Sequence, residues 1–152
     1  MILNGLGGKA LPVYGKGDNI RDWLHVDDHC RALLQMVESG IPGETYLVGG
    51  NAESRNIDTV MLICKLLDEL NPNSTNASHG ELINYVQDRP GHDLRYAIDF
   101  SETQTALGWQ PTVGFEDGLR LTVNWYIMSE SWWQPLLEQH GATNRSGLGK
   151  AK

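Results

Sequence analysis

Cysteine, positive charge and long apolar runs are all scarce in this chain of 152 residues. Its two cysteines, Cys30 and Cys64, lie in separate segments of helical periodicity and belong to no Cys-x-x-Cys motif. A disulfide framework is therefore not expected, and two reduced, packed thiols favour a cytoplasmic protein. No apolar run approaches the ~18 residues of a membrane helix. With 12 lysines and arginines against 19 acidic residues, the net charge of −7 argues against non-specific binding to nucleic acid or to anionic lipid.

The residues that are present are typical of one α/β domain. Hydrophobic residues make up 40% of the chain and charged residues 20%, which suits an ordinary globular protein. Apolar residues at a helical period predict helices over residues 1–6, 28–39, 56–70, 101–107 and 114–128. Short apolar or alternating runs predict strands over residues 11–14, 20–24, 44–48 and 82–86. Small and polar residues from 140 onward predict a disordered tail.

The helix over residues 28–39 is expected to begin with Asp27 or Asp28 as its cap, because an aspartate side chain can accept from the first free N–H groups. Its buried stripe is predicted to consist of Cys30, Leu33, Leu34 and Val37. The strand over 44–48 would then complete a helix–strand unit. The loop over 71–80 is rich in asparagine and serine and is expected to be an exposed linker.

The most distinctive stretch is R-P-G-H-D at residues 89–93, which follows the predicted strand 82–86. Proline fixes φ and glycine permits a positive φ, so a tight turn with outward side chains is expected. Arg89 and the nearby Arg95 carry planar forks of donors that suit phosphate oxygens, and His92 adds a further donor. The stretch predicts an anion clamp, although a surface turn with an arginine–aspartate pair explains the same residues.

Three residues outside this turn could join it. Tyr14 precedes a glycine turn and could stack on a nucleobase, Arg21 could hold a phosphate, and Asn56 could hydrogen-bond to one. Each also has a structural explanation: a core tyrosine, a surface arginine, and an asparagine that caps the helix over 56–70. The residues by themselves leave these alternatives open.

Two other motifs match known sites only as strings. G-L-G-G-K-A at residues 5–10 fits the dinucleotide pattern G-x-G-x-x-A, but only four residues precede it and Pro12 blocks the helix that should follow. His25 and His29 have the spacing of a zinc helix, but no acidic residue directly follows the first histidine. Neither a dinucleotide site nor a metal site is therefore expected.

Five segments taken together resemble one enzyme family. In order they read L-P-V-Y-G-K-G-D-N-I-R-D-W-L-H-V-D-D-H, Y-L-V-G-G, R-N-I-D, R-P-G-H-D-L-R-Y-A-I-D and L-G-W-Q-P-T-V-G-F-E-D-G-L. Over about residues 1–135 the chain thereby resembles the C-terminal half of the dTDP-glucose 4,6-dehydratases, which are extended short-chain dehydrogenases/reductases. R-D-W-x-x-V-x-D is shared by many nucleotide-sugar epimerases and dehydratases, whereas R-P-G-H-D-x-R-Y-A-I-D singles out the dTDP-glucose enzymes.

The resemblance implies the C-terminal part of an extended short-chain dehydrogenase/reductase fold, with short strands and about four to five helices. Residues 1–139 would form the substrate-binding domain, and 140–152 the disordered tail. The strand 44–48 would be an orphan of the Rossmann sheet, most of which this sequence lacks. Because that strand would expose an apolar edge, self-association into a homo-oligomer is expected.

The resemblance also implies a nucleotide-sugar pocket, with an aromatic face for the base and forked donors for the diphosphate. The residues that match the family's motif are Pro12 and Tyr14 at the thymine, Arg21 and Arg89 at the diphosphate, and Asn56 and His92 in the rest of the pocket. A small-molecule nucleotide sugar, dTDP-glucose, is thus the implied ligand.

The parts of the family pattern that perform the chemistry are missing here. The sequence has no glycine-rich loop between a strand and a helix, and none of its five tyrosines is followed four residues later by lysine. No catalytic or cofactor-binding residue is therefore assigned. The intact family protein would be an NAD-dependent lyase that forms dTDP-4-keto-6-deoxyglucose, with NAD bound by the N-terminal half. This chain is expected to be a truncated portion that binds substrate and is inactive alone.

Two alternative functions stay open. The chain could be a non-catalytic nucleotide-sugar binding module, or it could be part of a related UDP-sugar epimerase or decarboxylase. A preference for thymidine over uridine nucleotides separates the dehydratase from the epimerase or decarboxylase.

Overall fold

The computed structural model describes residues 1–72 and 77–140, and within them it shows an α/β chain with six α-helices and five short strands. The helices are α1 Ile2–Leu6, α2 Val26–Ser39, α3 Asn56–Leu70, α4 Ser101–Leu107, α5 Phe115–Met128 and α6 Glu130–His140. The strands are β1 Leu11–Tyr14, β2 Ile20–Asp22, β3 Glu53–Arg55, β4 Ile83–Val86 and β5 Arg95–Tyr96, and the 3-10 helix η1 spans His79–Leu82. All five predicted helices are confirmed within two residues at each end.

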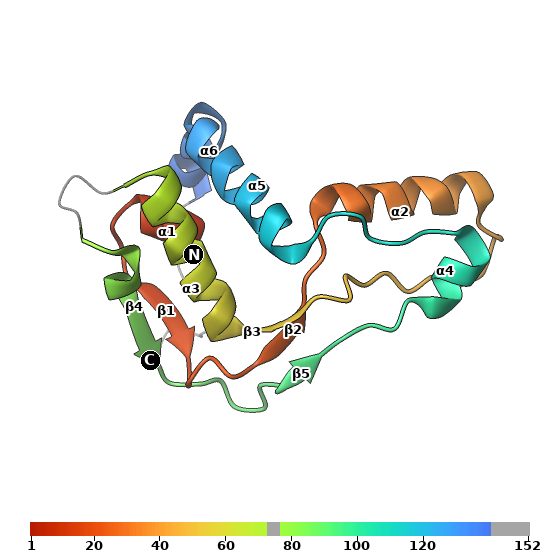
Figure 1. Ribbon diagram of the computed structural model, residues 1–152, viewed down its shortest axis with the longest axis horizontal. Helices are drawn as coiled ribbons and strands as arrows, with labels where there is room; N and C mark the ends of the chain where they lie inside the picture. Colours follow the sequence, from red (N-terminus) through yellow and green to blue (C-terminus); the bar gives the residue numbers. More distant parts are fainter. Residues whose placement is uncertain (73–76, 141–152) are drawn as a thin grey trace.

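Two small parallel pairings join segments that are far apart in the sequence. Strand β1 pairs with β4, from Leu11 opposite Ile83 to Tyr14 opposite Val86. In the second sheet β2 lies between β3, which is antiparallel to it, and β5, which is parallel. The connection between β1 and β2 therefore lies beside the connection between β4 and β5 (Figure 1).

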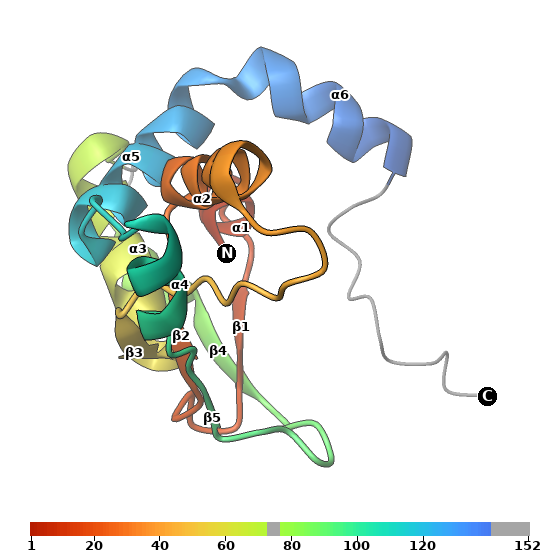
Figure 2. The same ribbon diagram turned by 90° about the vertical axis from the view of Figure 1, so that its right-hand side faces the viewer.

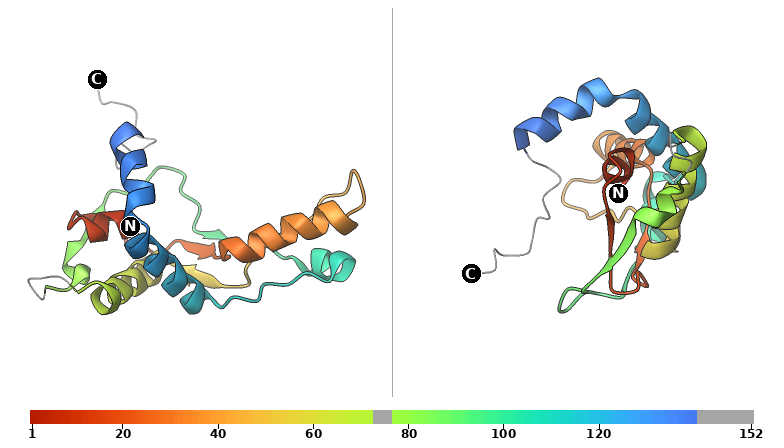
Figure 3. Two further views of the ribbon diagram at one scale, coloured as in Figure 1. Left: turned by 90° about the horizontal axis from the view of Figure 1, so that it is seen from above. Right: turned by 90° about the vertical axis from the view of Figure 1, so that its left-hand side faces the viewer.

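Helix α3 carries the hydrophobic core. One side packs over β1 through a cluster of Leu11, Val13, Ile57, Val60 and Cys64. Another side packs against α5 through a cluster of Ile63, Leu66, Leu67 and Val123. Figures 1 and 3 show these elements at one end of the molecule, whereas α2 and α4 lie side by side at the other end.

No strand forms at residues 44–48, so that prediction is wrong for this chain. Tyr46 turns back toward the end of α2, and its hydroxyl accepts a hydrogen bond from the Ile41 N–H at 2.8 Å. A strand needs a neighbour to satisfy its N–H and C=O groups, and none of the described segments forms a ladder with this one. The polar strand β3, which the sequence does not predict, forms because β2 provides that neighbour.

The glycines after residues 44–48 permit a close crossing of two chain segments. A Cβ on Gly50 would lie 1.8 Å from the carbonyl oxygen of Trp23, so no other residue fits there without moving the backbone. The Asp22 carboxylate accepts hydrogen bonds from the Gly50 N–H at 2.9 Å and the Ala52 N–H at 2.8 Å. The end of β2 is thereby fixed to the segment that leads into β3.

Helix α2 forms where it is predicted, but its apolar stripe is not buried. Leu34 is 63% exposed and Val37 is 86% exposed, and Leu33 and Cys30 are exposed as well. The helix is held on another side, where Ala32 is fully buried. The prediction of a buried stripe is wrong because no sheet among the described residues covers that face.

The predicted aspartate cap of α2 is also wrong. His25 occupies the N-cap position, and its ring nitrogen Nδ1 accepts from the Asp27 N–H at 3.4 Å. The Asp27 side chain is 83% exposed, whereas Asp28 is 1% exposed and faces the segment before α5. Asp28 therefore connects two elements instead of capping one.

The Asp28 carboxylate fastens α2 to the segment that precedes α5. It accepts from the N–H groups of Thr112 at 3.0 Å and Val113 at 2.9 Å, and from the Arg31 guanidinium. The Trp109 indole N–H donates to the Asp28 carbonyl oxygen at 3.1 Å. Burial by itself would raise the pKa of Asp28, but the hydrogen bonds from Val113, Arg31 and Thr112 outweigh burial and lower the pKa to about 2.

The loop over 71–80, predicted to be an exposed linker, contains a buried histidine. His79 is fully buried in η1, and its ring nitrogen Nδ1 lies 2.5 Å from the Asp68 carboxylate of α3. The prediction of an exposed linker is therefore wrong at His79. Its burial depends on contacts with α3, which the local sequence does not show.

Helix α6 is another element that is not among the predicted helices, and Pro135 lies inside it. Its first turn packs against α5 (Figure 2). The ring centroids of Trp125 and Trp132 lie 5.2 Å apart, and the Trp133 indole N–H donates to the Tyr126 carbonyl oxygen at 2.7 Å. The predicted tail over 140–152 lies outside the described residues except for its first residue, which is the last residue of α6.

Replacement of Asp28 by asparagine should lower the free energy of unfolding at neutral pH by about 2 kcal/mol. A neutral amide loses the charge-assisted hydrogen bonds and leaves one buried backbone donor without an acceptor. The matched control is Asp27→Asn, which changes the exposed neighbour and should stay within about 0.5 kcal/mol of the wild type. Urea denaturation at one temperature measures all three proteins.

The same carboxylate should make stability depend on acidity. The folded-state pKa of about 2 lies below the ordinary aspartate value of 3.8, so the stabilisation by Asp28 is complete above about pH 4 and is lost as the pH falls toward 2. The stability difference between wild type and Asp28→Asn should therefore shrink in that window. A difference that stays constant from about pH 5 to pH 2 would show that the Asp28 charge does not stabilise the fold.

Candidate functional site

The chain that follows β4 runs alongside the chain that joins β1 to β2. The Gly15 and Ile20 N–H groups donate to the carbonyl oxygens of Val86 at 2.9 Å and Leu94 at 2.7 Å. These bonds fix the R-P-G-H-D turn against the end of β1 and the start of β2. Side chains 71 residues apart in the sequence thereby come within hydrogen-bond distance.

Two arginines converge on one ring nitrogen of His92. The Nη2 atom of Arg21 lies 3.1 Å from His92 Nε2, and the Nη2 atom of Arg89 lies 3.0 Å from the same nitrogen. Tyr14 completes the group: its ring centroid lies 6.0 Å from that of His92 at an interplanar angle of 77°, and the Arg89 guanidinium carbon lies 5.1 Å from it. Four of the six predicted site residues are therefore brought together.

Asp88 fixes the orientation of the His92 ring. His92 Nδ1 lies 2.7 Å from the Asp88 carboxylate, and the Arg89 N–H donates to the same oxygen at 2.8 Å. The hydrogen bond from His92, followed by that from the Arg89 backbone, lowers the pKa of Asp88 below its usual value. In the tautomer that carries its proton on Nδ1, His92 donates to Asp88 and presents Nε2 as an acceptor to both arginines.

The turn has the shape that the sequence predicts. Gly91 has a φ of +69°, in the left-handed region that its lack of a Cβ permits. The His92 N–H donates to the Arg89 carbonyl oxygen at 3.2 Å and closes the turn. The turn thus places the Arg89 and His92 side chains on the same side of the loop.

The two converging arginines differ from the other described arginines in their partners. Carboxylates pair with the four others, which are Arg31, Arg55, Arg95 and Arg120. Arg21 and Arg89 instead donate to the neutral His92 ring, and Arg21 also donates to the backbone carbonyl oxygens of Ile20 at 2.6 Å and Asp93 at 3.1 Å. Two guanidinium groups that lie together and form no ion pair with a carboxylate of the described residues within 4.0 Å make a site that suits an anion.

Pro12 and Asn56 are not joined to this group by any described hydrogen bond or ring contact. Pro12 lies in β1 two residues before Tyr14, opposite Asn84, so it shares the strand face of Tyr14. Asn56 is the first residue of α3, and its N–H donates to the Asn19 carbonyl oxygen at 2.8 Å. Arg55 takes the N-cap position, so the alternative of Asn56 as the cap is wrong.

The prediction for Arg95 is wrong, and two residues next to the site, Asp88 and Tyr96, are not predicted. Arg95, expected to suit phosphate, forms a bidentate pair with Glu53, in which Nε and Nη2 donate to the two carboxylate oxygens at 2.7 Å each. Asp88 directly precedes the R-P-G-H-D motif, and its position four residues before His92 is the signal that could have identified it as the partner of that histidine. Tyr96 lies in the same stretch, and only the pairing of β5 with β2 reveals that its ring faces Arg21.

The described residues do not fit NAD. The string at residues 5–10 begins with the last two residues of α1 and leads into β1, whereas a dinucleotide turn must follow a strand and lead into a helix N-terminus. His25 caps α2, and no group of three or more histidine, cysteine or acidic side chains among the described residues could hold a metal ion. None of the helices within the described ranges has both the length and the apolar character of a membrane-spanning segment.

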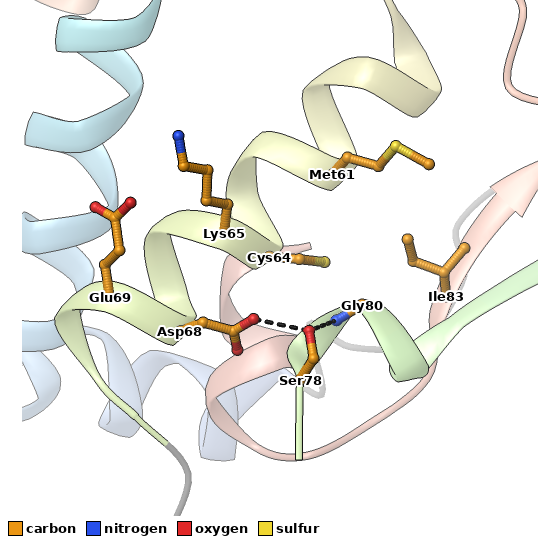
Figure 4. A pocket seen from close by; sticks show the side chains of 8 residues that line it. All are labelled: Met61, Cys64, Lys65, Asp68, Glu69, Ser78, Gly80 and Ile83. Carbon is orange, nitrogen blue, oxygen red and sulfur yellow. Dashed lines mark hydrogen bonds between the residues drawn. The ribbon is translucent and has the colours of Figure 1, made fainter. Parts of the chain in front are cut away.

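A separate pocket of about 480 Å³ lies between α3 and η1 (Figure 4). Its lining includes Cys64, Asp68 and Ser78, and the Ser78 hydroxyl donates to the Asp68 carboxylate at 2.8 Å. Burial and the Asp68 charge raise the pKa of the Cys64 thiol to about 11, so it stays protonated at neutral pH. The polar groups of this pocket thus hold η1 on α3, and they do not form a reactive centre.

Comparison with known proteins identifies relatives over nearly the whole chain. A family model described as GDP-mannose 4,6 dehydratase matches residues 1–122. The probable dTDP-glucose 4,6-dehydratase of Sinorhizobium fredii is 56% identical over 148 residues, which are 97% of this chain and 42% of that protein. The chain therefore spans less than half the length of this curated relative.

Solved structures share the fold. The dTDP-glucose 4,6-dehydratase of Streptomyces venezuelae, with NAD and TYD bound, has a TM-score of 0.76 and 40% identity and covers 89% of this chain, with 39% of its own chain matched. A UDP-glucose 4-epimerase from Thermotoga maritima, solved with UDP-glucose, has a TM-score of 0.70 at 25% identity, over 84% of this chain and 38% of its own.

The family-model match over residues 1–122, supported by identities above one half to dTDP-glucose 4,6-dehydratases, shows that the chain belongs to the GDP-mannose 4,6 dehydratase family of extended short-chain dehydrogenases/reductases.

Proposed function

We propose that this chain binds the nucleoside diphosphate of dTDP-glucose and is the substrate-binding portion of an NAD-dependent dTDP-glucose 4,6-dehydratase. The observation that carries the proposal is the convergence of Arg21 and Arg89 on His92. Forked guanidinium donors suit the oxygens of a diphosphate, which would also neutralise the two adjacent cations. The Streptomyces relative solved with TYD supports this assignment.

Tyr14 would supply an aromatic face for the thymine. Its ring contacts both His92 and the Arg89 guanidinium, so a base against it would lie next to the proposed diphosphate site. Pro12 would border the base from the same strand face, and Asn56 would complete the pocket from the start of α3. These roles follow the family's motif at each position.

The whole protein would be a lyase, and this chain would contribute binding energy to its reaction. Interactions with the remote nucleotide position the sugar and help to lower the barrier even though they do not touch the reacting carbons. The described residues do not fit NAD, and no catalytic residue is assigned to them. NAD would be bound by the part of the protein outside this chain.

A role in a UDP-sugar epimerase is the second candidate, because the Thermotoga epimerase shares the fold at 25% identity. The R-P-G-H-D-L-R-Y-A-I-D stretch favours the dehydratase, and nucleotide preference decides between them. A binding module without catalysis would behave like the dehydratase portion in binding and would differ only when the remaining part of the protein is supplied.

The limits of the domain in the sequence and the cellular location of the chain are also proposals. Residues 1–139 would form the substrate-binding domain and 140–152 a tail, and the free thiols Cys30 and Cys64 support a cytoplasmic location. Limited proteolysis that removes only the last residues, and fractionation of cells that make the chain, would test these two points.

Arg21→Ala and Arg89→Ala should each weaken dTDP binding by about tenfold to a hundredfold. Each removes a charge-assisted interaction worth about 1.5–3 kcal/mol. Arg120→Ala is the matched control and should leave the affinity unchanged. Arg120 of α5 pairs with Glu69 of α3, away from the proposed site. Isothermal titration calorimetry on the purified chain measures all four proteins, and wild-type affinity in both site variants would contradict the diphosphate site.

The chain should bind dTDP more tightly than UDP, and with NAD it should not convert dTDP-glucose. Turnover is expected only when the remaining part of the protein is added. Calorimetry with the two nucleotides tests the first expectation, and chromatography of dTDP-glucose incubated with chain and NAD tests the second. A preference for UDP would favour the epimerase.

We also propose that the isolated chain forms homo-oligomers through the exposed stripe of α2, because Leu34 and Val37 are exposed apolar side chains on one helix face. A double change of both to lysine should shift the weight-average mass measured by light scattering toward the monomer. Met61→Lys, at a 53% exposed position on α3, is the control and should not shift it. A monomeric wild type at all concentrations would refute the proposal.

A further inference from the structure

The Arg21 guanidinium has a contact besides those with His92 and the backbone, because it also lies against the Tyr96 ring. Its carbon lies 4.8 Å from the centre of the Tyr96 ring, within the range of a cation–π contact. Arg21 and Tyr96 are directly opposite each other in the parallel pairing of β2 with β5. The aromatic face is thus provided by the neighbouring strand and does not depend on loop geometry.

Asp93 links the same groups from the turn. Its carbonyl oxygen accepts from Arg21 Nη2 at 3.1 Å and from the Asn19 side-chain amide at 3.1 Å, and its carboxylate accepts from the Tyr96 hydroxyl. One residue therefore contacts both the edge of the guanidinium and the ring that covers its face. The guanidinium therefore has contacts at its edge and over one face.

Strand β5 has only two residues, and a salt bridge fastens it. Arg95 of β5 pairs in bidentate geometry with Glu53 of β3, and β2 runs between these two strands. The pair spans the strand that carries Arg21 and anchors the strand that carries Tyr96. The register of this sheet places Tyr96 directly opposite Arg21.

We propose that Tyr96 and Asp93 are positioning residues, which hold the Arg21 guanidinium in the orientation that binds a diphosphate. The inference rests on the proposed function and extends it, because neither residue needs to touch the ligand. A long side chain fixed before binding loses less conformational freedom when the ligand arrives. The ligand class that senses this restraint is a nucleoside diphosphate, since only the phosphates meet Arg21.

Tyr96→Leu should weaken dTDP binding about threefold to tenfold, which is the size of effect expected for an exposed cation–π contact and its restraint. Binding of thymidine, which lacks phosphates, should be unchanged. Tyr96→Phe keeps the ring and loses the hydrogen bond to Asp93, so its loss should be smaller. The control is Tyr85→Leu, because Tyr85 is 56% exposed on β4 and Tyr96 is 57% exposed.

A double-mutant comparison separates positioning from general damage. In an Arg21→Ala background, Tyr96→Leu should cause no further loss of dTDP affinity, because the side chain it positions is gone. An equal loss in both backgrounds, or an equal loss for thymidine, would overturn the inference. Circular dichroism confirms that each variant is folded, which is expected because Tyr96 is exposed.

A second measurement needs no ligand. In the free chain, ¹⁵N relaxation at the Arg21 Nε–H should show more motion in Tyr96→Leu than in the wild type and the Tyr85→Leu control. Unchanged motion would refute positioning even if dTDP binds. If the wild type binds no dTDP but the motion increases, the proposed function is wrong and the restraint on Arg21 stands.

Discussion

Strand β2, with three residues, is the constraint on which the site depends. It pairs on one side with β3 and on the other with β5, and the Asp22 carboxylate at its end accepts two N–H groups from the 50–52 segment. Side chains alternate between the two faces of a strand, so a slip of one residue would move Arg21 away from His92. The site is therefore positioned by backbone pairing, because the main hydrophobic core lies elsewhere, around α3.

Local features of the sequence predict much of this arrangement. The apolar period of α3 and the proline–glycine turn at residues 89–93 both specify their own backbone, and both are confirmed. The strand at 44–48, the buried stripe of α2 and the exposed 71–80 linker fail because each depends on which segment lies alongside. Burial of His79 by α3 and exposure of Val37 on α2 are decided by tertiary neighbours, which a periodic pattern does not name.

The candidate site divides in the same way. Residue chemistry points to Arg89 and His92 but leaves Tyr14 and Arg21 open, and the family resemblance adds those two. The structure brings the four together. Residue chemistry does not indicate that Arg95 forms a salt bridge with Glu53. That partner lies 42 residues away and is brought to Arg95 only by the β3-β2-β5 sheet. Arginine chemistry suits phosphate at every position, so the pairing of each arginine decides its role. Arg21 and Arg89 stand out only after the carboxylate partners of the others are known.

The surroundings of His92 and those of α2 differ in how fully the described residues pair the polar groups and cover the apolar side chains. Around His92, the turn is closed by its own hydrogen bonds, and the arginines have acceptors among the described residues. At the other end, α2 leaves its apolar stripe exposed and the neighbouring 44–48 segment forms no ladder. Both features lie on consecutive parts of the chain and call for a hydrophobic, strand-pairing neighbour. The proposed nucleotide binding and the proposed self-association would therefore be separable, since the residues assigned to one are not among those assigned to the other.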